Sequence, residues 1–153
     1  MDFLLQIFSN PCVLSCLGAW LAAQVIKTVI HAVTNKGFNL RRLFGDGGMP
    51  SGHTATVTAL ATACGLTEGF DSAVFAVSAI LTVVVCRDAV GVRRETEKQA
   101  KLLNKMVSAM ETESPLTEEP LNTLIGHTPL QIAVGAAIGI GVALIVCVAT
   151  ATQ

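Results

Sequence analysis

The stretch PLQIAVGAAIGIGVALIVCVATA, residues 129–151, decides the fold class because it carries no charged side chain. A helix needs about 20 consecutive apolar residues to cross a hydrocarbon core ~30 Å thick, and this stretch is long enough. A surface helix of a soluble protein would carry a polar stripe at helical period, which is absent here. The stretch therefore predicts a transmembrane helix.

Outward from this helix, three more apolar runs lie at residues 11–33, 51–67 and 70–90. The first and third match the length of a membrane span, whereas the second is marginal and needs its flanks to cross. The apolar parts of the second and third runs are separated only by Thr67, Glu68 and Gly69, so these two helices must be antiparallel neighbours. The sequence predicts an all-α bundle of about four transmembrane helices, forming a single membrane domain over residues 1–153.

The composition agrees with a membrane protein. Hydrophobic residues make up 52% of the chain and charged residues 14%, whereas soluble domains carry about 25% charged residues. The five cysteines lack the spacing of a zinc site, a redox motif or a disulfide framework. We find no nucleotide-binding glycine fingerprint and no nucleic-acid patch. Residues 1–10 lack the basic start of a cleavable signal peptide, so we expect the first run to be retained as a span.

The basic region after the third run predicts a helix of another kind. Between Glu95 and Met110 one helical face collects the apolar residues Ala100, Leu103, Met106, Val107 and Met110. This pattern is typical of an amphipathic helix lying at the membrane interface. We expect Lys98, Lys101 and Lys105 to face solvent or lipid headgroups.

The distribution of charge predicts the orientation in the membrane. Lys and Arg number 10, and all lie between Lys27 and Lys105, in or beside the loops at residues 34–50 and 91–128. Basic loops stay in the cytoplasm under the positive-inside rule, so both termini and the hairpin at Glu68 should face the opposite side. The plasma membrane is the default location.

Small residues at helical spacing predict close contacts between helices. Gly135 and Gly139 form a Gly-x-x-x-Gly pair, and Ala55, Ala59 and Ala63 recur every four residues. Residues of this size let two helix backbones approach each other closely in a membrane.

Polar residues gather at the predicted span ends on the cytoplasmic side. They are Lys27 and His31, residues 47–53, the group Arg87, Asp88, Arg93 and Arg94, and residues 126–129. Two of these ends are helix N-termini, where backbone N–H groups and the helix dipole favour an anion. Arginine binds a tetrahedral oxyanion through two donors and lysine binds it as a point charge, so this arrangement predicts a phosphate site.

Two histidines supply reactive groups for such a site. One imidazole of the pair His53 and His127 can attack phosphorus while the other, protonated, donates to the leaving oxygen. This scheme requires no metal and no other cofactor.

The same residues carry a resemblance to a known superfamily. The motif PSGH at residues 50–53 resembles the Pro-Ser-Gly-His motif of the type 2 phosphatidic acid phosphatase superfamily, which includes the vanadium haloperoxidases. Residues 126–135 resemble its final His-x-x-x-Asp segment. The chain is similar above all to a divergent branch of small membrane proteins, through GGMPSGH at 47–53, RDAVGVRR at 87–94 and GHTP at 126–129.

The resemblance implies a role for each residue. His127 would be the nucleophile that forms a phosphohistidine, and His53 would be the general acid for the leaving alcohol. Apart from what the resemblance implies, we expect Asp88 to orient His127, because the superfamily's aspartate is replaced by Gln131. The phosphate oxygens would be held by Ser51, Gly52, Lys27, Arg42, Arg93 and Arg94.

Three positions depart from the superfamily pattern. Leu121 stands where the superfamily has an arginine, Gln131 where it has an aspartate, and residues 41–43 read Arg-Arg-Leu where it has Arg-Pro. We expect Arg93 or Arg94 to replace the missing arginine.

The resemblance thus implies a membrane phosphatase acting on a lipid phosphomonoester or pyrophosphate, such as a phospholipid or polyprenyl phosphate. The alternative is a non-catalytic membrane protein that binds anionic lipid or a partner protein. Pro50-Ser51 and Thr128-Pro129 also fit ordinary helix starts, and Gln131 fits the second position of a capping box. Four short spans could require a homo-oligomer to enclose a site.

Overall fold

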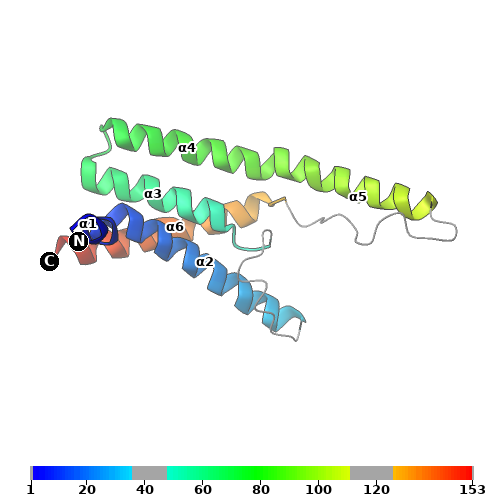
Figure 1. Ribbon diagram of the computed structural model, residues 1–153, viewed down its shortest axis with the longest axis horizontal. Helices are drawn as coiled ribbons and strands as arrows, with labels where there is room; N and C mark the ends of the chain where they lie inside the picture. Colours follow the sequence, from blue (N-terminus) through cyan, green and yellow to red (C-terminus); the bar gives the residue numbers. More distant parts are fainter. Residues whose placement is uncertain (1, 36–47, 111–125, 153) are drawn as a thin grey trace.

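The computed structural model describes residues 2–35, 48–110 and 126–152, and these residues form helices and short connections without any strand. The helices are α1 (Asp2–Ser9), α2 (Pro11–Asn35), α3 (Gly52–Glu68), α4 (Ala73–Val90), α5 (Val92–Met110) and α6 (Pro129–Ala151). Figure 1 shows α2, α3, α4 and α6 side by side in one bundle. The all-α prediction is confirmed.

Helix α3 is the centre of the bundle, because it contacts α2, α4 and α6. The buried core is made of alanines: Ala19, Ala23, Ala55, Ala59, Ala63 and Ala143. Side chains this small let the helix backbones come close together. The helices are therefore held by van der Waals contact between their backbones and small side chains, and not by interlocking large side chains.

The closest approach is between α3 and α6. A Cβ atom added to Gly135 would lie 2.6 Å from the Ser51 carbonyl oxygen, and one added to Gly139 would collide with Thr58 Oγ1 and the Ala55 carbonyl oxygen. These distances leave no room for a side chain at either glycine. The predicted close packing through Gly135, Gly139 and the alanine repeat is confirmed.

Within the described residues, three helical segments are long and apolar enough to cross a membrane: Pro11–Thr34, Ala73–Ala109 and Pro129–Ala151. Helix α3, with 17 residues, is not among them. Its threonines satisfy their hydroxyls within the helix, as Thr58 Oγ1 donates to the Thr54 carbonyl oxygen at 2.7 Å and Thr62 Oγ1 to the Thr58 carbonyl oxygen at 2.8 Å. A central position among three helices suits this more polar segment, and its membrane crossing stays a prediction.

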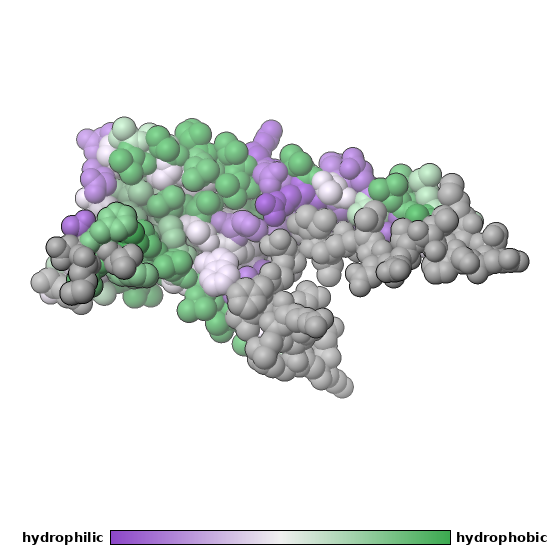
Figure 2. All heavy atoms as spheres, in the orientation of Figure 1, coloured by the Kyte–Doolittle hydropathy of each residue, from purple (hydrophilic) through white to green (hydrophobic). Residues whose placement is uncertain are grey.

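The outer surface of α4 is apolar along its length. Val77 is 71% exposed and Ile80 is 65% exposed. Figure 2 shows apolar side chains over α3 and α4, with hydrophilic side chains at the α3–α4 hairpin and where α4 meets α5. An exposed apolar surface of this extent, bounded by polar ends, is what a bilayer would cover.

Helix α5 continues α4 almost without interruption. The Gly91 N–H donates to the Arg87 carbonyl oxygen at 2.8 Å, and the Glu95 N–H donates to the Gly91 carbonyl oxygen at 3.0 Å. In Figure 1, α5 keeps the direction of α4 and extends beyond the bundle. The helix expected at residues 95–110 is therefore present and begins at Val92, whereas its interfacial orientation stays a prediction.

Helix α1 has no counterpart in the sequence analysis. It is short and amphipathic, and its large side chains Phe3, Leu5 and Phe8 are exposed. It packs against the beginning of α2.

Candidate active site

The start of α3 is fixed by a buried serine. Ser51 has an extended backbone, and its Oγ accepts hydrogen bonds from the Thr54 N–H at 3.4 Å and from Thr54 Oγ1 at 3.1 Å. The hydroxyl thereby satisfies one of the N–H groups that an α-helix leaves unpaired in its first turn. Ser51 and Gly52 are buried, whereas His53 in the same turn is exposed.

The start of α6 is fixed by a capping box. Thr128 Oγ1 accepts from the Gln131 N–H at 3.3 Å, and Gln131 Oε1 accepts from the Thr128 N–H at 2.9 Å. Pro129 occupies the first turn, where its missing N–H costs nothing. The predicted structural role of Gln131 is confirmed.

Two backbone hydrogen bonds join these helix starts to each other and to α4. The Ser51 N–H donates to the Gln131 carbonyl oxygen at 3.2 Å, and the His127 N–H donates to the Ala89 carbonyl oxygen at 3.2 Å. The starts of α3 and α6 and the end of α4 therefore form one connected layer. The structure brings these three helix ends together as the sequence predicted.

His127 lines a polar pocket of about 280 Å³ beside this layer. The other residues around the pocket are Arg94, Glu97, Lys98, Lys101, Gly126 and Thr128. His127 itself is 3% exposed. Three cationic side chains from α5 thus surround a space that one histidine and the beginning of α6 also border, which favours binding of an anion.

A carboxylate holds the backbone next to His127. Glu97 accepts a hydrogen bond from the Gly126 N–H, and it pairs with Lys101 on its own helix. The hydrogen bond from Lys101 is the main cause that holds the pKa of Glu97 below its ordinary value. Burial opposes it, and the charge of Lys101, the Gly126 N–H and the charge of Arg94 each lower the pKa further by smaller amounts. Glu97 therefore stays ionised at neutral pH.

The two predicted arginines of α5 have different surroundings. Arg93 Nε donates to Asp88 Oδ2 at 2.8 Å, a partly exposed ion pair at the corner between α4 and α5. Arg94 lies at the His127 pocket, and its Cα is 2.8 Å from where a Cβ on Gly126 would lie. Arg94 is the better placed of the two to contact an anion there, and the carboxylate of Asp88 is occupied by Arg93.

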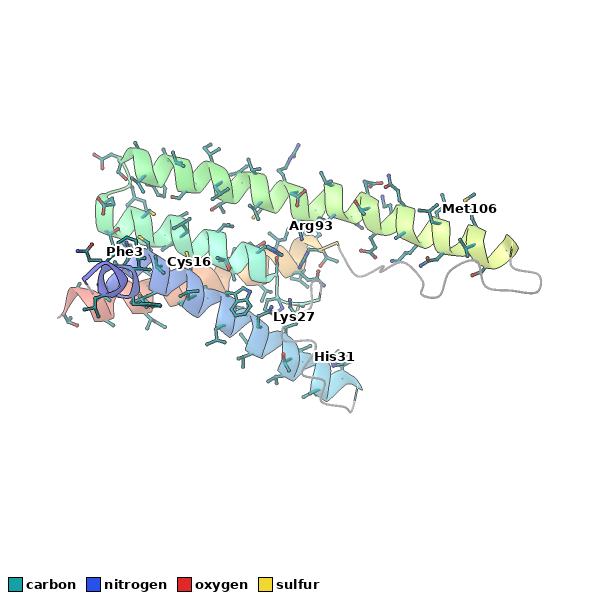
Figure 3. All side chains as sticks on the ribbon, in the orientation of Figure 1. Phe3, Cys16, Lys27, His31, Arg93 and Met106 are labelled. Carbon is teal, nitrogen blue, oxygen red and sulfur yellow. The ribbon has the colours of Figure 1, made fainter. Side chains whose placement is uncertain are left out.

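Lys27 lies beside the segment that precedes α3 and is not among the residues that line the His127 pocket. It is buried in α2, and Gly48, with φ of 87°, lies against its side chain, so that an added Cβ would be 3.8 Å from Lys27 Cγ. Figure 3 shows Lys27 and Arg93 at the same end of the bundle. Arg42 and Leu121 lie outside the described residues.

Arg94 of α5 was expected at the site from the sequence, whereas Glu97, Lys98 and Lys101 of the same helix were not. Lys98 and Lys101 were expected to face solvent or headgroups, and Glu97 had no predicted role. One signal was available, because Arg94, Lys98 and Lys101 recur at intervals of three and four residues and so share a helical face. Among the residues with described positions, no group of three His, Cys, Asp or Glu side chains could hold a metal ion.

The fold and this pocket define a helical membrane protein with a cation-rich cavity beside a buried histidine at one end of its bundle. The chain matches the model of the Divergent PAP2 family over residues 8–142 and belongs to that family. It is 37% identical over 155 residues to a protein of Bacillus subtilis (strain 168) named "Uncharacterized membrane protein YuiD", covering 92% of this chain and 96% of the relative. No solved structure matches the chain. The relative's name and the three apolar segments identify an integral membrane protein.

Proposed function

We propose that this protein is a metal-independent phosphatase that hydrolyses a phosphate ester or pyrophosphate on a membrane lipid. The observation that carries the proposal is the pocket of His127, which combines a histidine, the beginning of α6 and the cations Arg94, Lys98 and Lys101. A phosphoryl group needs such positive charge because negative charge is spread over its oxygens in the transition state.

The chemistry would proceed in two steps. A ring nitrogen of His127 attacks phosphorus, a P–N bond forms, the P–O bond to the lipid breaks, and His53 gives a proton to the leaving oxygen. Water then attacks the phosphohistidine, the P–N bond breaks, and His53 takes the proton from that water. In this proposal Ser51, Gly52, Lys27 and Arg94 hold phosphate oxygens, and Arg93 fixes Asp88.

An apolar groove next to the pocket supports a lipid as the substrate. The groove, of about 510 Å³, lies between α4 and α6 and is lined by Thr82, Val83, Cys86, Arg87, Val90, Pro129 and Ile132. Pro129 follows His127 by two residues, and Val90 follows the Ala89 that accepts the His127 hydrogen bond. A hydrocarbon chain in this groove would place its headgroup beside Arg87 and the pocket.

The orientation of the site is part of the proposal. The concentration of all Lys and Arg between Lys27 and Lys105 supports a cytoplasmic site, with both termini and the α3–α4 hairpin on the opposite side of the plasma membrane. A phospholipid or polyprenyl phosphate would then diffuse in the inner leaflet to reach α4 and α6.

The test is phosphate release from a panel of lipid phosphates by purified protein in detergent, with and without vanadate. We expect turnover of at least one lipid, inhibition by vanadate, and loss of turnover and of acid-labile protein phosphorylation in His127→Ala. An Ile132→Trp variant should lose about tenfold on long-chain lipids, because a filled pocket rejects its ligand, while Ile145→Trp on the exposed side of α6 should not.

The second candidate function is a non-catalytic protein that binds anionic lipid. It is favoured by Gln131, which serves as a cap where the superfamily has an aspartate. Saturable binding of anionic lipid without turnover of any member of the panel would support this function and contradict the phosphatase.

A further inference from the structure

The residues 126 and 127 are held by one continuous helical segment. The Gly126 N–H donates to the carboxylate of Glu97 on α5, and the next N–H, that of His127, donates to the Ala89 carbonyl oxygen at 3.2 Å at the end of α4. Because α5 continues α4, two successive amides are bound to positions about two helical turns apart on this segment. Their position relative to α4 and α5 is therefore fixed at two points.

The contact at Gly126 is close as well as polar. A Cβ added to this glycine would lie 2.9 Å from Glu97 Oε2 and 3.2 Å from Arg94 Cβ. Only a residue without a side chain can approach α5 to this distance. The glycine thus allows the carboxylate to reach the backbone directly.

Glu97 also differs from the other acidic residue of this turn. Glu95 pairs with Lys98 at 2.6 Å, and its side chain is 62% exposed. Glu97 is 21% exposed and lines the His127 pocket, where it faces Arg94, Lys98 and Lys101 of α5 and His127 of the α6 start. An ionised carboxylate in a site for phosphate repels the ligand and weakens its binding. Its presence there therefore needs a compensating benefit to the reaction.

We propose that Glu97 is a positioning residue, which fixes the His127 imidazole for attack by binding the Gly126 N–H from α5. This inference rests on the proposed phosphatase function. The gain is the restriction of the nucleophile to one geometry, because a displacement of about 1 Å can cost a hundredfold in rate. The repulsion of phosphate is the accompanying loss in ground-state binding.

The kinetic test compares Glu97→Ala, Glu97→Gln and the control Glu95→Ala on one lipid phosphate. We expect Glu97→Ala to lower kcat by about ten- to a hundredfold and to lower KM as well, because a negative charge leaves the pocket. Glu97→Gln keeps an acceptor oxygen and should retain more of kcat, and Glu95→Ala should match the wild type. A kcat of Glu97→Ala equal to or above that of the wild type would show that Glu97 merely blocks the pocket, and a fall of kcat at unchanged KM would show a loss of folded protein; either result overturns the proposal.

A second measurement tests the contact between the Gly126 N–H and the Glu97 carboxylate and does not depend on turnover. In labelled protein the Gly126 amide resonance should titrate with the Glu97 carboxyl, whose lowered pKa keeps the bond intact at neutral pH and breaks it as the pH falls through that pKa. Glu97→Gln should remove this titration, and Glu95→Ala should keep it. If the resonance behaves so but no lipid is hydrolysed by the wild type, the phosphatase function fails while the contact stands; a Gly126 resonance that ignores Glu97 overturns the inference itself.

Discussion

The start of α3 and the start of α6 are built alike and surrounded differently. Each is capped by a hydroxyl and carries a histidine, but Ser51 is buried beside exposed His53, whereas Thr128 is exposed beside buried His127. The neighbours explain the reversal, because Gly52 lies near Trp20 of α2 while Gly126 lies against α5. Two similar motifs thus present their imidazoles in opposite ways.

The difference assigns the two histidines to different tasks in the proposed reaction. A buried imidazole whose backbone is bonded to α4 suits a nucleophile, since its reacting nitrogen must be held in line with the bond that breaks. An exposed imidazole suits a proton carrier, which must exchange with water between the two steps. The following predictions test this division, from the largest effect to the smallest.

The largest expected effect separates the two histidines by leaving group. His127→Ala should abolish turnover of every substrate, because no P–N bond can form. His53→Ala should lower turnover of an alkyl phosphate by about 10²- to 10⁴-fold, the range of general acid catalysis, and should cost far less on a nitrophenyl phosphate, whose leaving group needs no proton. Steady-state rates on the two substrates provide the measurement, and equal losses on both would contradict the assignment of His53.

The next effect concerns the glycines that hold the two helix starts together. Gly139→Ala and Gly135→Ala place a methyl group against the backbone of α3 and should lower the free energy of unfolding by about 1–3 kcal/mol, as overpacking does. Gly141→Ala is the matched control, because nothing lies within 4 Å of its added Cβ. Thermal unfolding in detergent gives the ranking. A Gly141→Ala variant as unstable as Gly139→Ala would show that α3 and α6 are not packed as described.

A smaller effect distinguishes the two caps. Loss of a hydroxyl cap costs about 0.5–2 kcal/mol, and Ser51→Ala should lie near the upper end because its buried Oγ serves two donors of Thr54. Thr128→Ala should lie lower, since the exposed N–H of Gln131 can bond to water instead. Thr128→Ser should be neutral. The denaturation midpoints of the three variants provide the measurement. A larger loss of stability in Thr128→Ala than in Ser51→Ala would show that the start of α3, and not that of α6, is exposed to solvent.

The smallest effect is that of the ion pair at the corner of α4 and α5. Asp88 and Arg93 are both partly exposed, so Asp88→Asn should change stability by no more than about 1 kcal/mol. A loss of kcat in this variant without loss of stability would indicate that Asp88 orients His127 in addition to binding Arg93. Unchanged kcat would contradict the expected role of Asp88 in orienting His127.

The helices of the bundle were largely predictable because their signals are local. The predicted runs at 11–33 and 129–151 correspond to α2 and α6, and the caps at Ser51 and Thr128 mark two helix starts. The run at 70–90 begins instead at Ala73, because Ser72 Oγ accepts from the Phe75 N–H at 3.1 Å and Gly69 adopts a φ of 94°. The Ser72 cap and the positive φ of Gly69 set the start of α4 and exclude Phe70 from the helix, although Phe70 is hydrophobic.

The candidate site was predictable only where single residues carry the signal. The motifs at 50–53 and 126–129 led to His53 and His127, and the charge pattern led to their common side. The contact of Gly126 with Glu97 depends on how two segments that are distant in the sequence pack against each other. No local pattern encodes this packing. The pairing of Arg93 with Asp88, and the placement of Arg94 at the pocket, follow from the same tertiary arrangement.

The central position of α3 has a consequence for how the protein is made. Helix α3 is the shortest and most hydroxyl-rich segment of the bundle, and its threonines weaken it as an insertion signal for the translocon. Helix α4, joined to it by a tight hairpin, is strongly apolar, so the two would partition into the bilayer as one unit. The site would then be assembled late, once α6 emerges from the ribosome and its glycines meet the waiting surface of α3.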